Sequence, residues 1–180
     1  MEITKTSIEG LVIIQPNVFN DDRGYFMEAF KESIFKSEFP HINFVQDNES
    51  KSSYGVLRGL HFQKAPYEQT KLVRVIHGEV LDIAVDIRTN SSTFGKYESI
   101  VLSGANKKQF LIPKGFAHGF VVLSETAILN YKVDNYYDPK SDNGIIWNDT
   151  DLSIDWKVDT CDLKISEKDL NLPQLSKILL

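Results

Sequence analysis

The stretch VLDIAVDIR at residues 80–88 decides the fold class because its side chains alternate in character. Leu81, Ile83, Val85 and Ile87 occupy every second position, and two aspartates stand among the residues between them. Successive side chains of a strand point to opposite faces, whereas the apolar face of a helix repeats with a longer period. The stretch therefore predicts a β-strand with one buried face.

The rest of the chain extends this pattern into an all-β fold. Similar short β-type runs lie at residues 11–14, 72–76, 99–102, 110–112, 120–123 and 128–133, with turn-forming residues between them. Closely spaced strands without interleaved helices are typical of antiparallel sandwiches and barrels. We expect helices only at residues 27–39 and just after Ser166, where Asp169 would complete a capping box and Pro173 would keep the helix short. The sequence thus predicts a jelly-roll-like barrel with short helices at its periphery and C-terminus.

Length and composition set the organisation of the chain. The 180 residues predict a single domain over residues 1–180, and 42% hydrophobic with 25% charged residues exclude wholesale disorder. The 20 Lys and Arg residues are outnumbered by 25 Asp and Glu residues, and the net charge of −5 argues against a nucleic-acid-binding protein. The sequence shows no secretory signal and no apolar run of membrane-spanning length. We therefore expect a protein that binds no membrane. Because Cys161 is the single cysteine and cannot form an internal disulfide, we also expect a reducing compartment, the cytoplasm.

Motifs for the common cofactors are missing from the sequence. It contains no Gly-rich phosphate loop, no dinucleotide-binding fingerprint and no serine nucleophile elbow. Small barrels often hold a metal with a His-x-His pair, but His61 is followed by Phe62 and Gln63. Together with His118 it would supply too few ligands. We therefore expect no metal and no redox cofactor, and a histidine that transfers protons instead.

The segment GVLRGLHFQ at residues 55–63 places an arginine and a histidine among apolar side chains. Strict alternation would put Arg58 and His61 on opposite faces of a strand. Both could serve one pocket only if the chain bulges, and Gly59 lies between them, where a bulge costs little. The alternative is a solvated Arg58 and a core His61 bonded to a carbonyl. The residues alone leave both interpretations open.

Three more polar residues lie where a half-buried barrel would not require them. Lys71 opens the strand at residues 71–76, Tyr131 shares a face with apolar neighbours, and His118 stands between two glycines in PKGFAHGF at residues 113–120. The structural alternatives are a solvated strand end for Lys71 and a core tyrosine with a satisfied hydroxyl for Tyr131. Taken singly, each residue is as consistent with a structural as with a functional role.

A specific pattern emerges when the motifs are taken in order. They are DDRGYFMEAF (21–30), FVQDNES (44–50), GVLRGLHFQ (55–63), KLVRVIHGEVLDIAVDIR (71–88), STFGKY (92–97), FLIPKGFAHGFVVLS (110–124), YKVDNYYDP (131–139) and GIIWNDTDLSIDW (144–156). From about Ile13 to the region of Pro173, this series resembles the dTDP-4-dehydrorhamnose 3,5-epimerase family. The resemblance implies a cupin-type jelly roll and a cofactor-free isomerase of bacterial deoxysugar biosynthesis.

The resemblance also implies roles for individual residues. His61 matches the general base that removes the protons at C3 and C5 of a 4-keto sugar, and Asp169 matches the carboxylate that raises its basicity. Tyr131 matches the acid on the other face of the ring, and Lys71 matches the cation beside the enolate oxygen. Positions that hold the nucleotide diphosphate and the sugar are matched by Arg23, Phe26, Glu28, Gln46, Asn48, Arg58, His118, Tyr137, Asp142 and Lys168. Asp142 stands where the family usually has a glutamate, and Tyr137 resembles the ring that stacks on thymine.

The implied reaction inverts C3 and C5 of dTDP-4-dehydro-6-deoxy-D-glucose through an enolate and gives dTDP-4-dehydro-β-L-rhamnose, in dTDP-L-rhamnose biosynthesis. The resemblance further implies a homodimer whose subunits exchange their N-terminal strands. Three alternatives stay open at this point. The protein could invert only C3 or only C5, it could be a metal-dependent cupin, or it could be a sugar-nucleotide-binding barrel without catalysis.

Overall fold

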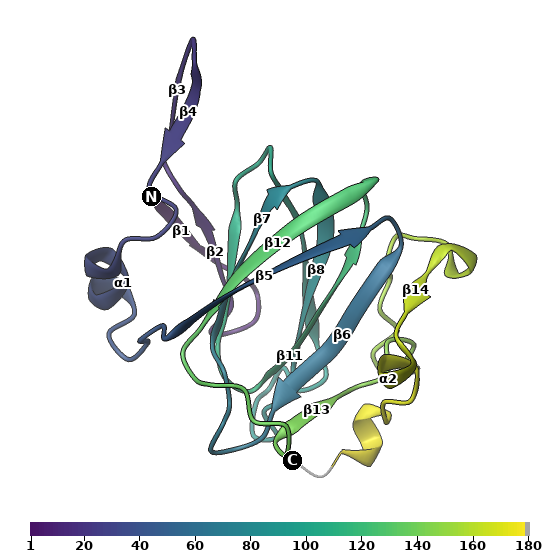
Figure 1. Cartoon of the computed structure of the whole chain (residues 1–180). Coiled ribbons are helices and arrows are strands. Elements are labelled where there is room, and N and C mark those ends of the chain that lie inside the picture. The colour runs from purple at the N-terminus through teal and green to yellow at the C-terminus, as the bar shows by residue number, and fades with distance from the viewer. Residues whose placement is uncertain (179–180) are drawn as a thin grey trace.

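The structure of the protein, a computed structural model, describes residues 1–178. The last two positions of the domain predicted over residues 1–180 therefore lie outside the described residues. Two six-stranded sheets and a separate hairpin form the β-structure of the described chain (Figure 1). This arrangement confirms the all-β prediction.

The strands of both sheets come from distant parts of the chain. In spatial order, the first sheet contains β1 (Glu2–Lys5), β2 (Val12–Gln15), β10 (Gln109–Ile112), β7 (Lys71–His77), β12 (Thr126–Val133) and β5 (Gln46–Ser53). The second sheet contains β13 (Asp142–Gly144), β6 (Val56–Gln63), β11 (Phe116–Val122), β8 (Glu79–Asp86) and β9 (Tyr97–Ser103), and β14 (Lys164–Ile165) adds to β6. Only β14 pairs in parallel among the strands of residues 1–178; the other ladders are antiparallel.

The core that holds the two sheets together is apolar. Val73, Phe110 and Leu129 of the first sheet cluster with Val80 and Phe120 of the second. Burying such side chains contributes about 1.5–3 kcal/mol each. The two sheets are thereby fixed face to face, and polar side chains among these strands are held between them.

Strand β8, which contains most of the stretch at residues 80–88, is buried on both faces. Its apolar row, which includes Ile83, packs outward against the C-terminal segment around Trp156 and Leu175. Its other row, which includes Ala84 and Asp82, lies on the inner side, and both residues are fully buried. The prediction of one buried face is wrong because the C-terminal segment covers the face that would otherwise meet water.

The remaining strand predictions depend on how apolar each strand is. Every other predicted run coincides with or overlaps a strand, namely β2, β7, β9, β10, β11 or β12. Strand β5 was not predicted, since its sequence QDNESKSS is polar throughout. Its place at the edge of the first sheet, beside β12, explains how so polar a segment is kept as a strand.

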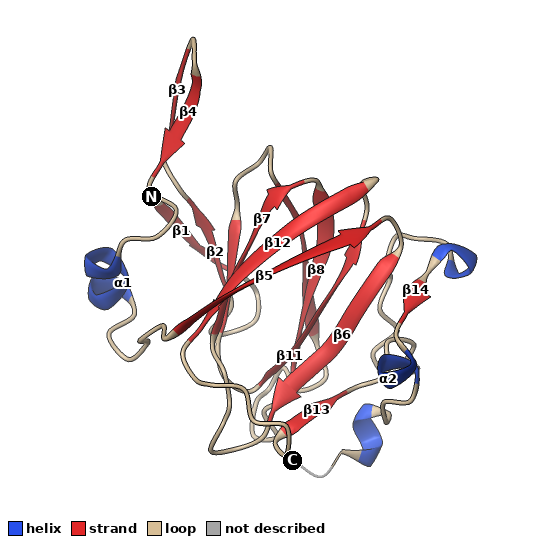
Figure 2. Ribbon diagram, in the orientation of Figure 1, coloured by secondary structure: helices blue, strands red, loops and turns tan. Residues whose placement is uncertain are grey.

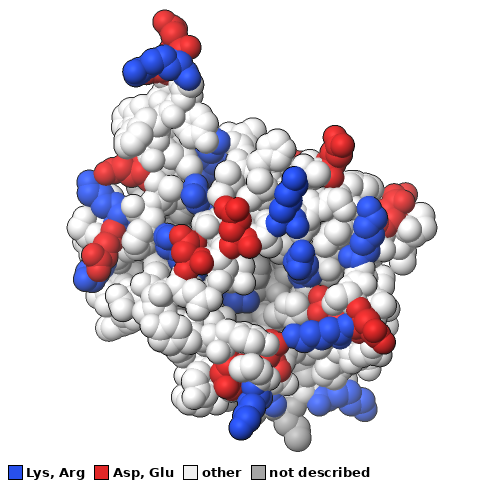
Figure 3. Space-filling view, in the orientation of Figure 1, with Lys and Arg blue, Asp and Glu red and all other residues white. Residues whose placement is uncertain are grey.

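A hairpin of β3 (Val18–Asp21) and β4 (Gly24–Met27) stands away from both sheets (Figure 1). Phe19 and Phe26 face each other across it and are exposed, Phe26 to 65%. Figure 3 shows acidic and basic side chains at the tip, where Arg23 is 90% exposed. The hairpin therefore presents aromatic and charged groups that its own chain does not cover.

The short helices lie outside the sheets (Figure 2). Helix α1 (Glu32–Glu38) is shorter than the predicted helix at residues 27–39, because Met27 ends strand β4 and residues 28–31 form an irregular connection before the helix. Helix α2 (Glu167–Leu170) confirms the second prediction: the Ser166 hydroxyl accepts the Asp169 amide at 3.1 Å. Short 3₁₀ turns lie on either side of α2 in the chain, at Thr160–Asp162 before it and at Leu175–Lys177 after it. No helix within residues 1–178 is long and apolar enough to cross a lipid bilayer.

Candidate active site

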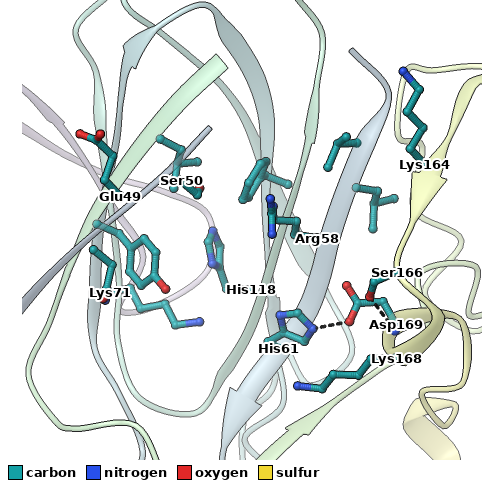
Figure 4. Close-up of a pocket in the computed structure, with 16 residues that line it drawn as sticks. Glu49, Ser50, Arg58, His61, Lys71, His118, Lys164, Ser166, Lys168 and Asp169 are labelled. Atoms are coloured by element: carbon teal, nitrogen blue, oxygen red, sulfur yellow. Dashed lines mark hydrogen bonds and ion pairs between the residues drawn. The ribbon is translucent and has the colours of Figure 1, made fainter. Parts of the chain in front are cut away.

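A cavity of about 630 Å³ lies between the two sheets. Its polar walls bring together side chains from β5, β6, β7, β11 and β12 and from the C-terminal segment. Figure 4 shows the side chains of Arg58, His61, Lys71 and His118 pointing into this common space. The cavity is lined by Asn48, Glu49, Ser50, Val56, Leu57, Arg58, His61, Lys71, His118, Phe120, Leu129, Tyr131, Lys164, Ser166, Lys168 and Asp169.

A bulge in β6 lets Arg58 and His61 reach the same cavity. The ladder between β6 and β11 pairs His61 with His118 and Arg58 with Phe120, and its register shifts between them. Gly59 at the shift has a φ of +132°, and a Cβ there would lie 2.5 Å from the backbone of β11. Only glycine fits this conformation and this close approach. The predicted bulge at Gly59 is confirmed.

His61 is held by a buried carboxylate. Its Nε2 lies 2.8 Å from Oδ1 of Asp169, whose Oδ2 accepts the backbone N–H of Gly59 at 3.3 Å. Burial acts to raise the pKa of Asp169, but its hydrogen bonds with His61 and Gly59 outweigh burial and lower it. Because an ionised carboxylate only accepts hydrogen bonds, neutral His61 donates from Nε2 and keeps a free lone pair on Nδ1. The pair can therefore present a basic nitrogen to a ligand.

We expect Asp169→Asn to lower kcat by about 10²- to 10⁴-fold, because an amide can donate to Nε2 and so favour the tautomer without a free Nδ1. Steady-state kinetics would measure this effect. Glu167→Gln, on the same helix but outside the cavity lining, is the matched control. A kcat within twofold of that control would contradict the role given to Asp169.

Tyr131 lines the cavity from the opposite sheet. It belongs to β12, beside Asn48 on β5 and Val73 on β7, whereas His61 belongs to β6 of the second sheet. Burial raises the pKa of the Tyr131 phenol, although the charge of Arg58 opposes this effect. The phenol is therefore protonated at neutral pH and can donate a proton from the wall that faces His61.

Lys71 and His118 add polar groups deeper between the sheets. Burial lowers the pKa of Lys71 to about 8, although the charges of Asp82 and Asp142 act to raise it. His118 Nε2 lies 3.0 and 3.1 Å from the two carboxylate oxygens of Asp82, and burial lowers the pKa of His118 in spite of this carboxylate. At neutral pH the cavity thus holds an ammonium beside a neutral imidazole.

Asp82 is the residue that sequence reasoning missed. It is fully buried, and its carboxylate pairs with the histidine that lines the cavity. The available signal was an aspartate inside an otherwise apolar strand, which implies a buried partner.

Several predicted binding residues lie at or beside the cavity. Gln46 donates from Nε2 to Asn48 Oδ1 at 2.8 Å. Asp142 Oδ2 accepts hydrogen bonds from Lys168 Nζ and from the Tyr137 hydroxyl, the latter at 3.0 Å. Asn48 and Lys168 line the cavity, so these contacts connect Gln46, Asp142 and Tyr137 to its walls.

Three predicted binding residues lie elsewhere. Arg23 and Phe26 belong to the exposed hairpin, where Arg23 pairs with Asp21. Glu28, just after the hairpin, pairs with Lys31 at 3.1 Å. None of these three is among the lining residues of the cavity in its own chain.

Within residues 1–178, no group of three or more His, Cys, Asp or Glu side chains is arranged to hold a metal ion. The two histidines of the cavity are each paired with one aspartate.

Known proteins similar to this chain share one description, that of an epimerase. The family model for dTDP-4-dehydrorhamnose 3,5-epimerase matches residues 5–177. The dTDP-4-dehydrorhamnose 3,5-epimerase of Escherichia coli K12 is 52% identical over 180 residues, which are 99% of this chain and 97% of the relative. The dTDP-6-deoxy-D-glucose-3,5-epimerase of Legionella pneumophila, solved in complex with dTDP-4-keto-L-rhamnose, is 47% identical with a TM-score of 0.94, over 98% of this chain and 94% of that one. A 3'-monoepimerase from Streptomyces bikiniensis, solved with dTDP-quinovose, is 31% identical with a TM-score of 0.88. The match covers 95% of this chain and 86% of that one. The predicted cupin-type jelly roll is confirmed by these structures.

Proposed function

Because the chain belongs to the dTDP-4-dehydrorhamnose 3,5-epimerase family, we propose that it inverts C3 and C5 of dTDP-4-dehydro-6-deoxy-D-glucose to give dTDP-4-dehydro-β-L-rhamnose. One observation carries this function beyond the likeness to relatives. A single cavity is lined by His61 of the second sheet with its partner Asp169 of helix α2, by Tyr131 of the first sheet and by the Lys71 ammonium. That arrangement is what an epimerisation beside a ketone requires.

The first step is proton removal from the carbon next to the keto group. Nδ1 of His61 takes the proton, since Asp169 occupies Nε2. The electron pair moves onto the keto oxygen and forms an enolate. Lys71 is the cation that stabilises this oxygen, and a preorganised charge of this kind contributes several kcal/mol in a site that excludes water.

The second step returns a proton to the other face of the sugar ring. Tyr131 gives its phenolic proton to the carbon, and the C–O⁻ of the enolate becomes the ketone again. The configuration of the carbon inverts because base and acid stand on opposite sheets. His61 then releases the proton that it took and Tyr131 regains one, both by exchange with solvent, and the restored pair serves the other carbon once the ring presents it.

The nucleotide is held by groups near the cavity mouth. The guanidinium of Arg58 and the ammonium of Lys168 suit a diphosphate, and the exposed ring of Tyr137 suits a stacked thymine. These contacts lie away from the reacting carbons, so their binding energy positions the sugar.

The product's ring geometry tests this function. We expect NMR coupling constants of the product to show inversion at both C3 and C5. Inversion at C3 alone would support the second candidate, a monoepimerase like the Streptomyces bikiniensis relative, which shares this fold. Binding of the nucleotide sugar without any inversion would overturn both enzyme assignments.

We further propose a homodimer in which the β3–β4 hairpin of each subunit completes the cavity of the other. The support is the position of Arg23, Phe26 and Glu28, which the sequence assigns to substrate binding but which lie outside the cavity of their own chain. Exposed aromatic side chains such as Phe26 mark interaction surfaces.

Complementation between two inactive variants would test this exchange. Arg23→Ala and His61→Asn each impair activity, but a mixed dimer would contain one site with an intact His61 and an intact Arg23. We expect co-expressed variants to recover a clear fraction of wild-type activity. If Arg23 acts within its own chain, the mixture stays as inactive as the separate variants.

The whole chain is proposed to act as one domain, and its location is proposed to be cytoplasmic. Cys161 is exposed and has no disulfide partner, which suits a reducing compartment.

A further inference from the structure

Asp82 is a fully buried carboxylate that does not itself line the cavity. It lies on the inner row of β8, and in the ladder with β11 it pairs with Phe120. Both of its oxygens lie within 3.1 Å of His118 Nε2. A buried carboxylate costs several kcal/mol of desolvation, so it stabilises the fold less than an apolar side chain of the same size would. Because the partner of this carboxylate, His118, lines the cavity, Asp82 is connected to the site and points to a functional role.

The contact with Asp82 fixes the hydrogen-bonding character of His118. The carboxylate accepts from Nε2–H, which leaves the Nδ1 of neutral His118 as an acceptor. Because burial lowers the pKa of His118, the imidazole keeps this state at neutral pH. His118 therefore suits a hydroxyl donor on the ligand.

Asp82 also acts on Lys71, which approaches from the opposite sheet. Lys71 lines the main cavity and also a second cavity of about 360 Å³ behind it. Charged and titratable groups surround Lys71 from several elements. Asp82 and Asp142 act on it through their charges. The other such groups that line the main cavity are Glu49, Arg58, His61, His118, Tyr131, Lys164, Lys168 and Asp169, and Lys64, Glu68 and Arg88 line the second. Asp82 is the carboxylate with the largest effect on Lys71, and it favours the ammonium.

We propose that Asp82 is a positioning residue for the reaction, which holds the imidazole of His118 at the cavity wall as a hydrogen-bond acceptor for the sugar and places a buried negative charge on the neighbouring strand. This inference rests on the proposed function, because it concerns the same cavity. It assigns Asp82 a role through its neighbours and not through contact with the sugar.

The sign of the pH effect follows from charge. Asp82 raises the tendency of Lys71 to stay protonated, so removing its charge lowers the pKa of Lys71 below its present value of about 8. Activity that needs the ammonium is lost as pH rises through that pKa. We therefore expect the alkaline limb of the kcat profile to move to lower pH by about one unit in Asp82→Asn. Affinity for dTDP, which lacks the sugar, stays unchanged.

Asp86→Asn is the matched control. Asp86 is also fully buried in β8, but its carboxylate binds Arg88, Ser91 and Thr93, none of which lines the main cavity. We expect this variant to unfold at a lower temperature and to keep the wild-type alkaline limb. A shift of the limb in both variants alike would overturn the proposal, since it would reflect a general loss of stability.

A second variant keeps the inference testable if Asp82→Asn does not fold. Lys71→Arg carries a guanidinium that stays charged at all accessible pH values, so its residual activity should lack the alkaline limb. A limb that persists would assign the titration to another group and overturn the proposal. If wild-type protein inverts neither carbon, the proposed function itself fails; if it inverts both but Asp82→Asn keeps the wild-type limb, only this inference fails.

Discussion

Replacing His61 with asparagine should lower kcat by about 10³- to 10⁴-fold, and exchange of solvent deuterium into the sugar should fall at C3 and C5 together. Both effects follow from the loss of the nitrogen that the buried carboxylate of Asp169 prepares as the base. Deuterium content at each carbon, measured by NMR after incubation with substrate in D₂O, reports the deprotonation step directly.

The control for this variant is His41→Asn, which changes an exposed histidine outside the cavity. It should retain wild-type exchange at both carbons. If His61→Asn loses exchange at only one carbon, a second base must serve the other. The single-base account would then be wrong, and His118 would be the first candidate for that second base.

Replacing Tyr131 with phenylalanine should reduce net inversion by about 10²- to 10⁴-fold while solvent exchange at the carbons falls much less. The variant keeps the base, so protons still leave and return on the His61 side. It lacks the only proton donor assigned to the opposite wall. NMR of the recovered nucleotide sugar would show deuterated substrate of unchanged configuration.

Tyr136→Phe makes the same change at a tyrosine that is exposed and outside the cavity lining. It should behave as wild type in both exchange and inversion. A parallel fall of exchange and inversion in Tyr131→Phe would contradict the assignment, because it would place the phenol in the deprotonation step.

The sequence allowed much of the fold to be predicted because alternation reports strands directly. The rows of β7, β10 and β12 are apolar enough to be recognised. The bulge at Gly59 could be predicted because strict alternation would place Arg58 and His61 on opposite faces of the strand. Strand β5 escaped prediction because its pairing with β12, and not its own apolarity, makes it a strand.

The candidate site was less accessible to sequence reasoning because it depends on contacts between distant segments. Asp169 and His61 are brought together although 108 positions separate them in the sequence. Asp82 gave only the signal of a charge in an apolar strand, and its partner His118 lies on a neighbouring strand. The position of Arg23 on a projecting hairpin could not be read from residue types, since alternation carries no information on what a hairpin contacts.

The central claim is that one imidazole removes the proton from each carbon and one phenol delivers a different, solvent-derived proton to the other side of that carbon. Mapping deuterium in the product of a single wild-type turnover in D₂O tests this claim most directly. The account predicts deuterium at both C3 and C5, each with inverted configuration. Product that is inverted at both carbons yet retains its original hydrogens would contradict the account.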